Sequence, residues 1–131
     1  MNATRLARGL AIGAGAMDFV TGLGLACGPA SVLALMRVPV PAAEALVFLR
    51  WVGAFVAAVG ATYLWGALQW RRLLRPVLEL TLFFRLAAGV FSAVAIGCGW
   101  LSPTWASVPM TDLALVVGQI ALLARGAGRH D

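Results

Sequence analysis

Two charged residues of opposite sign lie in the middle of long apolar runs of this sequence. Arg85 stands at the centre of LTLFFRLAAG, residues 80–89, and Asp18 interrupts the first apolar run. Asp18 follows Arg8 by ten residues, as Arg85 follows Arg75. In helices that rise 1.5 Å per residue, both charges would lie about 15 Å from those arginines. We therefore expect an ion pair between Asp18 and Arg85 at similar depth in the first and third apolar helices.

Glu79 offers the same region a second carboxylate. It lies nearer to the arginine-rich start of its segment than Arg85 does. A long arginine side chain can bend toward a charge at the end of a helix, so Glu79 could pair with Arg85. The alternative is Arg75, which precedes Glu79 by four residues and shares its helix face.

The buried ion pair has two interpretations. A structural pair would fix which helices meet and in what register. A functional pair would belong to a proton or anion pathway, because charges inside a membrane segment often mark such pathways. We favour the structural interpretation, since a pathway normally needs more polar residues than this chain supplies.

Asp112 and Gln119 are seven residues apart, so they share one face of the last helix. We expect Asp112 in the first turn, where a carboxylate complements the helix dipole at the outer side of the membrane. Gln119 is expected to donate a hydrogen bond to another helix. We assign both to the outer polar side of the protein.

The sequence holds two cysteines, Cys27 and Cys98, each near the outer end of its helix. Disulfides form in oxidising compartments such as a bacterial periplasm. A disulfide between them is therefore one option, although sequence alone does not give their separation.

Residue types that cofactor chemistry needs are scarce. The single histidine, His130, is in the C-terminal tail, and neither a P-loop nor a GxSxG motif occurs. No pair of histidines could ligate haem, and no cluster of ligands suits a metal. We expect no catalytic residue and no metal, and among cofactors only a quinone stays open.

Composition places these side chains in a membrane. Hydrophobic residues make up 62% of the 131 residues and charged residues only 11%, against about 25% in an average soluble domain. A soluble domain of this size could not bury so much apolar surface. The basic residues form no stripe interleaved with aromatic residues, so we expect no nucleic-acid partner.

Four apolar runs approach the roughly 20 residues that a membrane-spanning helix needs. They cover residues 6–27, 45–70, 77–100 and 109–124. Backbone groups in lipid must pair within their own segment, which requires helices. We expect one all-α domain over residues 1–131, an integral membrane bundle of four transmembrane helices.

Two connectors carry further predictions. Pro29 favours a short interfacial helix over residues 30–37, between the first and second spanning helices. A tight turn is expected between the second and third, formed by Arg71, Arg72, Arg75 and Pro76.

The arginines predict the orientation of the bundle. Seven lie at the two termini or between the second and third helices: Arg5, Arg8, Arg71, Arg72, Arg75, Arg125 and Arg129. The other connectors hold only Arg37 and Arg50. Because arginines gather on the cytoplasmic side, we expect both termini in the cytoplasm of a bacterium and a multi-pass protein of its inner (cytoplasmic) membrane.

Small residues recur at intervals of four, which lets helices approach closely in lipid. On the first helix the spacing singles out Gly9 with Gly13 and Gly24 with Gly28. On the second helix it singles out Gly53, Ala57 and Ala61. We expect these residues at the contacts of a compact bundle.

The order of features resembles that of small bacterial DoxX-like four-helix membrane proteins. The likeness lies in a glycine-rich first helix ending at Gly28-Pro29, in FLRWVGAFVAAVGATYLWG at 48–66, in FFRLAAG at 83–89 and in TDLAL at 111–115. The resemblance covers most of the chain and implies a four-helix bundle. Some members of that group are membrane subunits linked to quinone-dependent oxidation, but no activity is carried over.

Three functions are compatible with these observations. The first, which we favour, is a non-enzymatic membrane protein that acts by helix packing, with lipid and with other membrane subunits or copies of itself as partners. The second is a small carrier or channel for protons, anions or a lipophilic solute. The third is a quinone-linked redox component, which would need a flat apolar cleft near Arg85 or Trp65.

Overall fold

The computed structural model describes residues 2–129, and this part of the chain is all-helical. Its elements are α1 (Ala3–Cys27), α2 (Pro29–Leu35), α3 (Ala43–Leu68), α4 (Trp70–Gly97), the short 3-10 helix η1 (Pro103–Ala106) and α5 (Ser107–Ala124). Four of the helices are long and apolar enough to cross a membrane, with η1 and α5 together forming the last span. The expected fold class is confirmed at this level. His130 lies outside the described residues.

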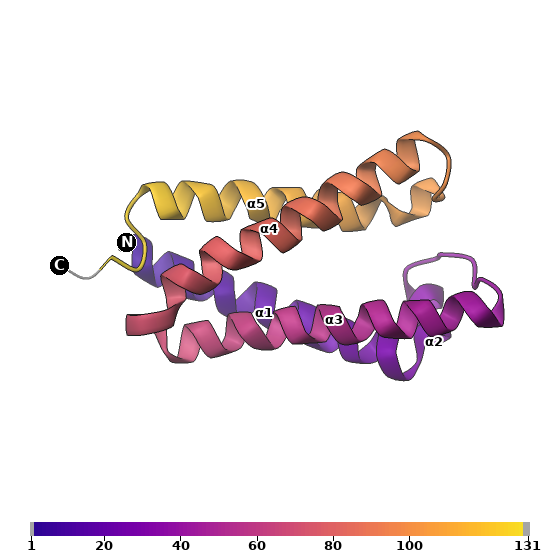
Figure 1. Cartoon of the computed structure of the whole chain (residues 1–131), viewed down its shortest axis with the longest axis horizontal. Coiled ribbons are helices and arrows are strands. Elements are labelled where there is room, and N and C mark those ends of the chain that lie inside the picture. The colour runs from indigo at the N-terminus through magenta and orange to yellow at the C-terminus, as the bar shows by residue number, and fades with distance from the viewer. Residues whose placement is uncertain (1, 130–131) are drawn as a thin grey trace.

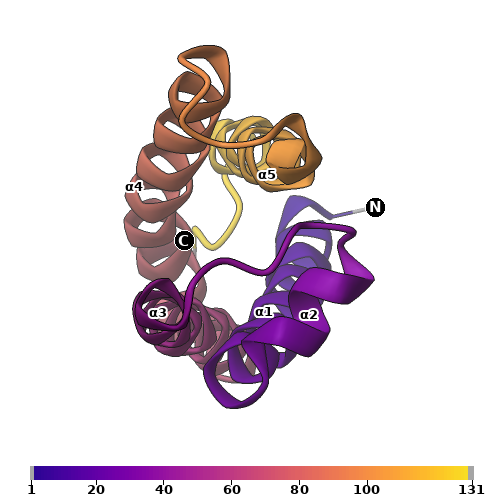
Figure 2. The same ribbon diagram turned by 90° about the vertical axis from the view of Figure 1, so that its right-hand side faces the viewer.

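The bundle consists of two antiparallel pairs. Figure 1 shows α1 running beside α3, and α4 beside α5, with the second pair crossing over the first. Seen from the end in Figure 2, the four long helices form a ring, and α2 lies beside the end of α1. The two ends of the described chain lie together, since the Gly128 N–H donates a hydrogen bond of 3.2 Å to Thr4 Oγ1.

The apolar core is built mainly from small and branched side chains at the end where the chain ends meet. Its fully buried members include Ala7, Ala11, Tyr63, Leu74 and Leu78. Many large apolar side chains instead point outward, among them Phe55, Phe83 and Trp65, each more than half exposed. An outer surface this apolar suits lipid rather than water.

The predicted turn at Arg71–Pro76 is wrong. A single residue, Gln69, separates α3 from α4, and Pro76 lies inside α4. A proline removes one backbone hydrogen bond from a helix and strains the preceding turn. The helix continues because Leu74 and Leu78, on either side of Pro76, are fully buried in the core. The second predicted helix therefore begins and ends two residues earlier than expected, and the third begins seven residues earlier and ends three residues earlier.

The other connectors differ from expectation by a few residues. The interfacial helix lies at Pro29–Leu35 instead of 30–37, with Pro29 in its first turn. It ends before Arg37, whose backbone has a positive φ of 58°. The last long helix, α5, begins at Ser107 instead of Pro109, because Pro109 is tolerated in the first turn of a helix.

Two arginines satisfy carbonyl groups at helix ends, which lack partners within the helix. Arg50 Nη1 donates hydrogen bonds to the carbonyls of Ala26, at 2.7 Å, and Cys27, at 2.8 Å, at the end of α1. Arg8 Nε donates one of 3.1 Å to the Ala67 carbonyl near the end of α3. Arg50 and Arg8 join α1 to α3 at both ends of the helix pair. This contact is separate from the effect of arginines on the orientation of the bundle in the membrane.

Candidate functional site

A buried cluster of four polar side chains joins the four long helices. Arg85 of α4 donates hydrogen bonds to Asp18 of α1 through Nη2 and to Asp112 of α5 through Nη1, the latter at 2.5 Å. Its Nε donates one of 3.3 Å to the hydroxyl of Tyr63 on α3. We call these four residues the Arg85 node. All three charged side chains are about nine-tenths buried.

The geometry of the node depends on the aromatic ring of Tyr63 and on one glycine, Gly89. The guanidinium carbon lies 5.4 Å from the centre of the Tyr63 ring, so the cation also faces an aromatic surface. One turn beyond Arg85, Gly89 leaves room for α5. A Cβ there would lie 3.0 Å from Leu113 and 3.2 Å from the Cβ of Asp112. The absence of a side chain at Gly89 therefore brings Asp112 within reach of Arg85.

The node contains one more negative formal charge than positive charge. Asp18 and Asp112 face the single guanidinium of Arg85. A guanidinium is a planar donor that can serve two carboxylates at once, which a lysine ammonium does less well. Removing the cation would leave two carboxylates uncompensated in a medium of low dielectric constant. Among the ion pairs of residues 2–129, the contact of Arg85 with Asp18 is the one that joins the two helix pairs.

The Asp18–Arg85 contact expected from the sequence is present, but Asp112 was misplaced. It is the sixth residue of α5, beyond the first turn, and it is buried. It does not cap the helix, because the helix begins at Ser107 and carries Asp112 inward to face α4. Asp112 thus completes the node as the second partner of Arg85.

Glu79 pairs with Arg75, which is the closer along the chain of its two expected partners, Arg75 and Arg85. Its carboxylate lies 2.8 Å from Arg75 Nε, four residues earlier on α4, and the Glu79 side chain is about half exposed. Exposed pairs of this kind contribute roughly 0.3–0.5 kcal/mol. Glu79 is therefore outside the node.

Gln119 does not lie on the outer side as expected. It is fully buried near the arginine-rich end of the bundle, where its Nε2 donates hydrogen bonds to the Leu78 carbonyl, at 3.2 Å, and to Thr81 Oγ1, at 2.9 Å. The reason is that α5 runs toward that end and Gln119 is in its last two turns. Its expected role as a donor to another helix is confirmed. Its Oε1 is the one fully buried polar side-chain atom of the described residues without a partner.

Replacing Gln119 with leucine is expected to change stability by less than about 1 kcal/mol. The substitution removes two hydrogen bonds, but it also removes a buried acceptor that has no donor, and such an acceptor is costly. Thr81 keeps its own bond to the Val77 carbonyl, at 2.6 Å. The midpoint of unfolding in detergent measures the change. Glu at the same position is the contrasting variant, because it would bury a charge and lower the midpoint strongly.

The two cysteines do not form the disulfide that the sequence left as an option. Cys27 and Cys98 are both free and exposed. Cys27 is the last residue of α1, and Cys98 directly follows the last residue of α4. Figure 1 shows that the α4–α5 pair diverges from the α1–α3 pair toward this end, which keeps the two helix ends apart.

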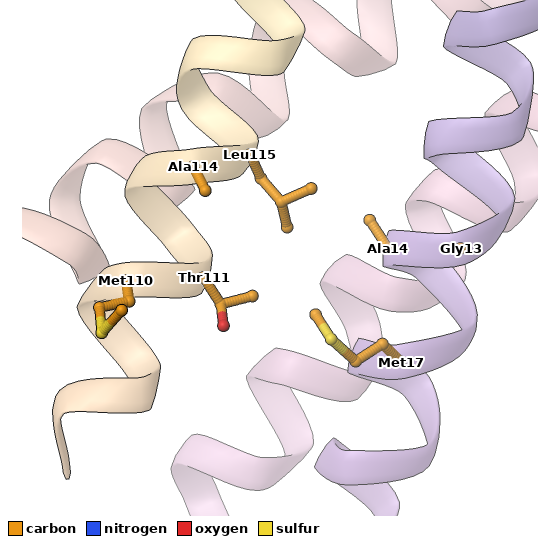
Figure 3. Close-up of a pocket in the computed structure, with 7 residues that line it drawn as sticks. All are labelled: Gly13, Ala14, Met17, Met110, Thr111, Ala114 and Leu115. Atoms are coloured by element: carbon orange, nitrogen blue, oxygen red, sulfur yellow. The ribbon is translucent and has the colours of Figure 1, made fainter.

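An open cleft lies between α1 and α5, beside the node. Its volume is about 520 Å³, and its walls are Gly13, Ala14, Met17, Met110, Thr111, Ala114 and Leu115. Figure 3 shows Thr111 and Leu115 of α5 pointing across the space toward Ala14 and Met17 of α1, while Met110 lies on the side of α5 away from α1. Met17 precedes Asp18, and Thr111 precedes Asp112, so the cleft follows the same stretch of the bundle as the node. The cleft opens on the outer surface of the bundle.

A smaller groove of about 330 Å³ lies at the junction of α3 and α4. Trp65, Gln69, Arg72 and Leu73 line it. This groove is near Trp65, where a quinone-linked function would need a cleft, but an arginine and a glutamine form half of its wall. Among residues 2–129 there is no group of three metal-ligating side chains.

Tyr63 is the member of the node that sequence reasoning missed. It is the only tyrosine of the chain and lies within an apolar run. A phenolic hydroxyl inside a membrane normally needs a hydrogen-bond partner, and this was the available signal. The signal does not identify the partner, because it gives neither the face nor the depth of Arg85.

Residues 2–129 thus form an all-helical protein whose four long helices are apolar enough to cross a membrane, which is typical of a multi-pass membrane protein. Comparison with protein-family models, with characterised proteins and with solved structures finds no match.

Proposed function

We propose that this protein is a non-enzymatic integral membrane protein that acts by helix packing, as an accessory subunit of a larger membrane complex or as a homo-oligomer. The observation that carries this proposal is the Arg85 node, whose donors all bind groups on other helices of the same chain. Such a node holds four helices in one arrangement. The short connectors provide no separate domain for chemistry, while the exposed apolar side chains offer lateral contacts.

We also propose that the bundle lies in a bacterial inner membrane with both termini in the cytoplasm. The arginine distribution supports this orientation. The two chain ends and the junction of α3 and α4 lie at one end of the bundle, since Arg75 Nη1 donates to the Ala127 carbonyl at 3.5 Å. Seven of the ten arginines belong to these segments.

The two thiols provide a test of this orientation. Both are exposed at the end of the bundle opposite the arginine-rich one. We expect a membrane-impermeant maleimide to label Cys27 and Cys98 in intact spheroplasts, and labelling to stop in Cys27→Ser and Cys98→Ser at the respective site. Labelling only after the membrane is opened would reverse the orientation.

Purification in mild detergent, followed by mass spectrometry of the copurifying proteins and small molecules, tests the packing function. Stoichiometric membrane proteins, or a defined homo-oligomer, are the expected result. A monomer without partners in several detergents would contradict the proposal. A stoichiometric quinone in the extract would favour the redox function instead.

A carrier for a small lipophilic solute is the second candidate, because of the cleft between α1 and α5. The surplus carboxylate in the neighbouring node argues against an anion as the solute. Flux into proteoliposomes that is lost on narrowing the cleft would support this function over the first.

A further inference from the structure

We propose that the cleft between α1 and α5 binds a lipophilic monocation that enters sideways from the bilayer and is attracted by the neighbouring carboxylates of Asp18 and Asp112, one helical turn from the wall of the cleft. This site goes beyond the packing function and does not depend on it. Its occupant is defined by three properties of the cleft: its opening, its lining and the charge beside it.

The opening is lateral. The cleft lies between two helices that belong to different pairs, and α1 packs mainly on α3 while α5 packs mainly on α4. Glycine and alanine form much of its wall, and a Cβ added at Gly13 would meet nothing within 4 Å. A molecule dissolved in the bilayer can therefore reach the cleft without crossing the helix ends.

The lining selects an apolar body. Thr111 carries the one polar side chain of the wall, and no charged residue lines it. Met17 and Met110 contribute flexible, polarizable side chains that adapt to molecules of different shape. A strongly hydrated ion would lose its water in this cleft without enough replacement ligands.

The charge selects a cation. On α1, Asp18 follows the lining residue Ala14 by four positions, and on α5, Asp112 precedes Leu115 by three, so each aspartate lies one helical turn from an edge residue of the wall, on the side toward Arg85. Each carboxylate gives one oxygen to Arg85. Oδ1 of Asp18 and Oδ2 of Asp112 accept no hydrogen bond from the described residues.

These two oxygens are not fully enclosed by the described residues. Gln119 Oε1 is the one fully buried polar side-chain atom of residues 2–129 without a partner, so the free carboxylate oxygens retain accessible surface. One guanidinium cannot neutralise both aspartates, and Tyr63 adds no positive charge. A single positive charge in the cleft would balance the node, whereas an anion would add to its surplus.

Binding of tetraphenylphosphonium to the purified full chain in an uncharged detergent tests the proposal by equilibrium dialysis. We expect saturable binding at one site per chain. Triphenylphosphine oxide, which has similar rings and no net charge, is expected to bind roughly tenfold more weakly or worse, because it lacks the charge that the node attracts. Equal binding of the two probes would overturn the proposal.

Two variants distinguish the contribution of the node's charge to binding from that of the shape of the cleft. Asp112→Asn removes the surplus charge while Arg85 keeps Asp18, and we expect binding to weaken roughly tenfold or more. Gly13→Leu fills the cleft without touching the node and is expected to abolish binding while the protein stays folded. Glu79→Gln, an exposed position outside the cleft, is the matched control and should bind like the unaltered chain. Unchanged binding in Gly13→Leu, or no binding in the unaltered chain, would refute the site, whichever function the packing tests support.

Discussion

Replacing Arg85 with methionine is expected to lower the free energy of unfolding by about 3–5 kcal/mol, the usual cost of removing one partner from a buried ion pair. Methionine fills much of the space of the arginine stem but carries no charge. Asp18 and Asp112 would then face each other inside the bundle, and the Tyr63 hydroxyl would lose its donor. Reversible unfolding in mixed detergent micelles, followed by helix content, measures the change.

The matched control is Arg75→Met. Arg75 pairs with Glu79 at 2.8 Å on the partly exposed side of α4, and its removal is expected to cost less than about 1 kcal/mol. Arg85→Lys should fall between the two, because one ammonium cannot replace the planar guanidinium toward both carboxylates and Tyr63. A cost for Arg85→Met no larger than that for Arg75→Met would mean that the node contributes little to stability.

A triple variant tests whether the loss comes from unpaired charge. Combining Arg85→Met with Asp18→Asn and Asp112→Asn removes all three charges of the node. We expect it to recover most of the stability lost in the single variant, since the cost of a broken buried pair is mainly the charge that is left behind. No recovery would show that the node acts through hydrogen-bond geometry instead.

The Asp18–Arg85 contact could be predicted because it depends on a count along the chain. The rise of a helix is fixed, so equal distances from the arginine-rich ends give similar depths. Asp112 could not be placed in the same way. Its depth depends on where α5 begins, and its direction depends on Gly89, which lets α5 approach α4.

The limits of helices were harder to predict than their existence. The sequence shows four long apolar runs, and the structure has four long helices in those places. Proline and arginine at 71–76 indicated a turn, but burial of Leu74 and Leu78 keeps that stretch helical. A local signal for a break was outweighed by apolar contacts that the sequence alone does not reveal.

Small residues were predicted at the contacts of the bundle, but on α1 the spacing singled out the wrong glycines. Gly9 and Gly13 face open space, while Gly24 and Gly28 lie near α2. The contact on α1 is made by Gly15 and Gly22, which are seven residues apart. The glycines of α1 lie on two opposite faces, Gly9, Gly13 and Gly24 on one and Gly15 and Gly22 on the other, so spacing could not identify the face that meets α3.

Gly22→Ala is expected to destabilise the bundle by about 3 kcal/mol, at the upper end of the usual cost of overpacking. The new Cβ would lie 2.2 Å from the backbone nitrogen of Ala57 and 2.6 Å from the carbonyl oxygen of Gly53. Backbone atoms cannot rotate away as a side chain can, so α1 and α3 would have to separate. Separation loses the van der Waals contacts that hold helices together in lipid.

Gly60→Ala should behave in the same way, because its Cβ would lie 2.4 Å from the backbone nitrogen of Phe19 on α1. Gly9→Ala makes the same chemical change on α1 where a Cβ meets nothing within 4 Å. Alanine favours a helix over glycine by about 1 kcal/mol, so this control is expected to be neutral or slightly stabilising. The unfolding midpoints of Gly22→Ala, Gly60→Ala and Gly9→Ala, measured in one detergent, test whether α1 and α3 pack through their backbones. Equal midpoints for Gly22→Ala and Gly9→Ala would mean that α1 and α3 do not pack through their backbones, and the Arg85 node would then be the main link between the helices.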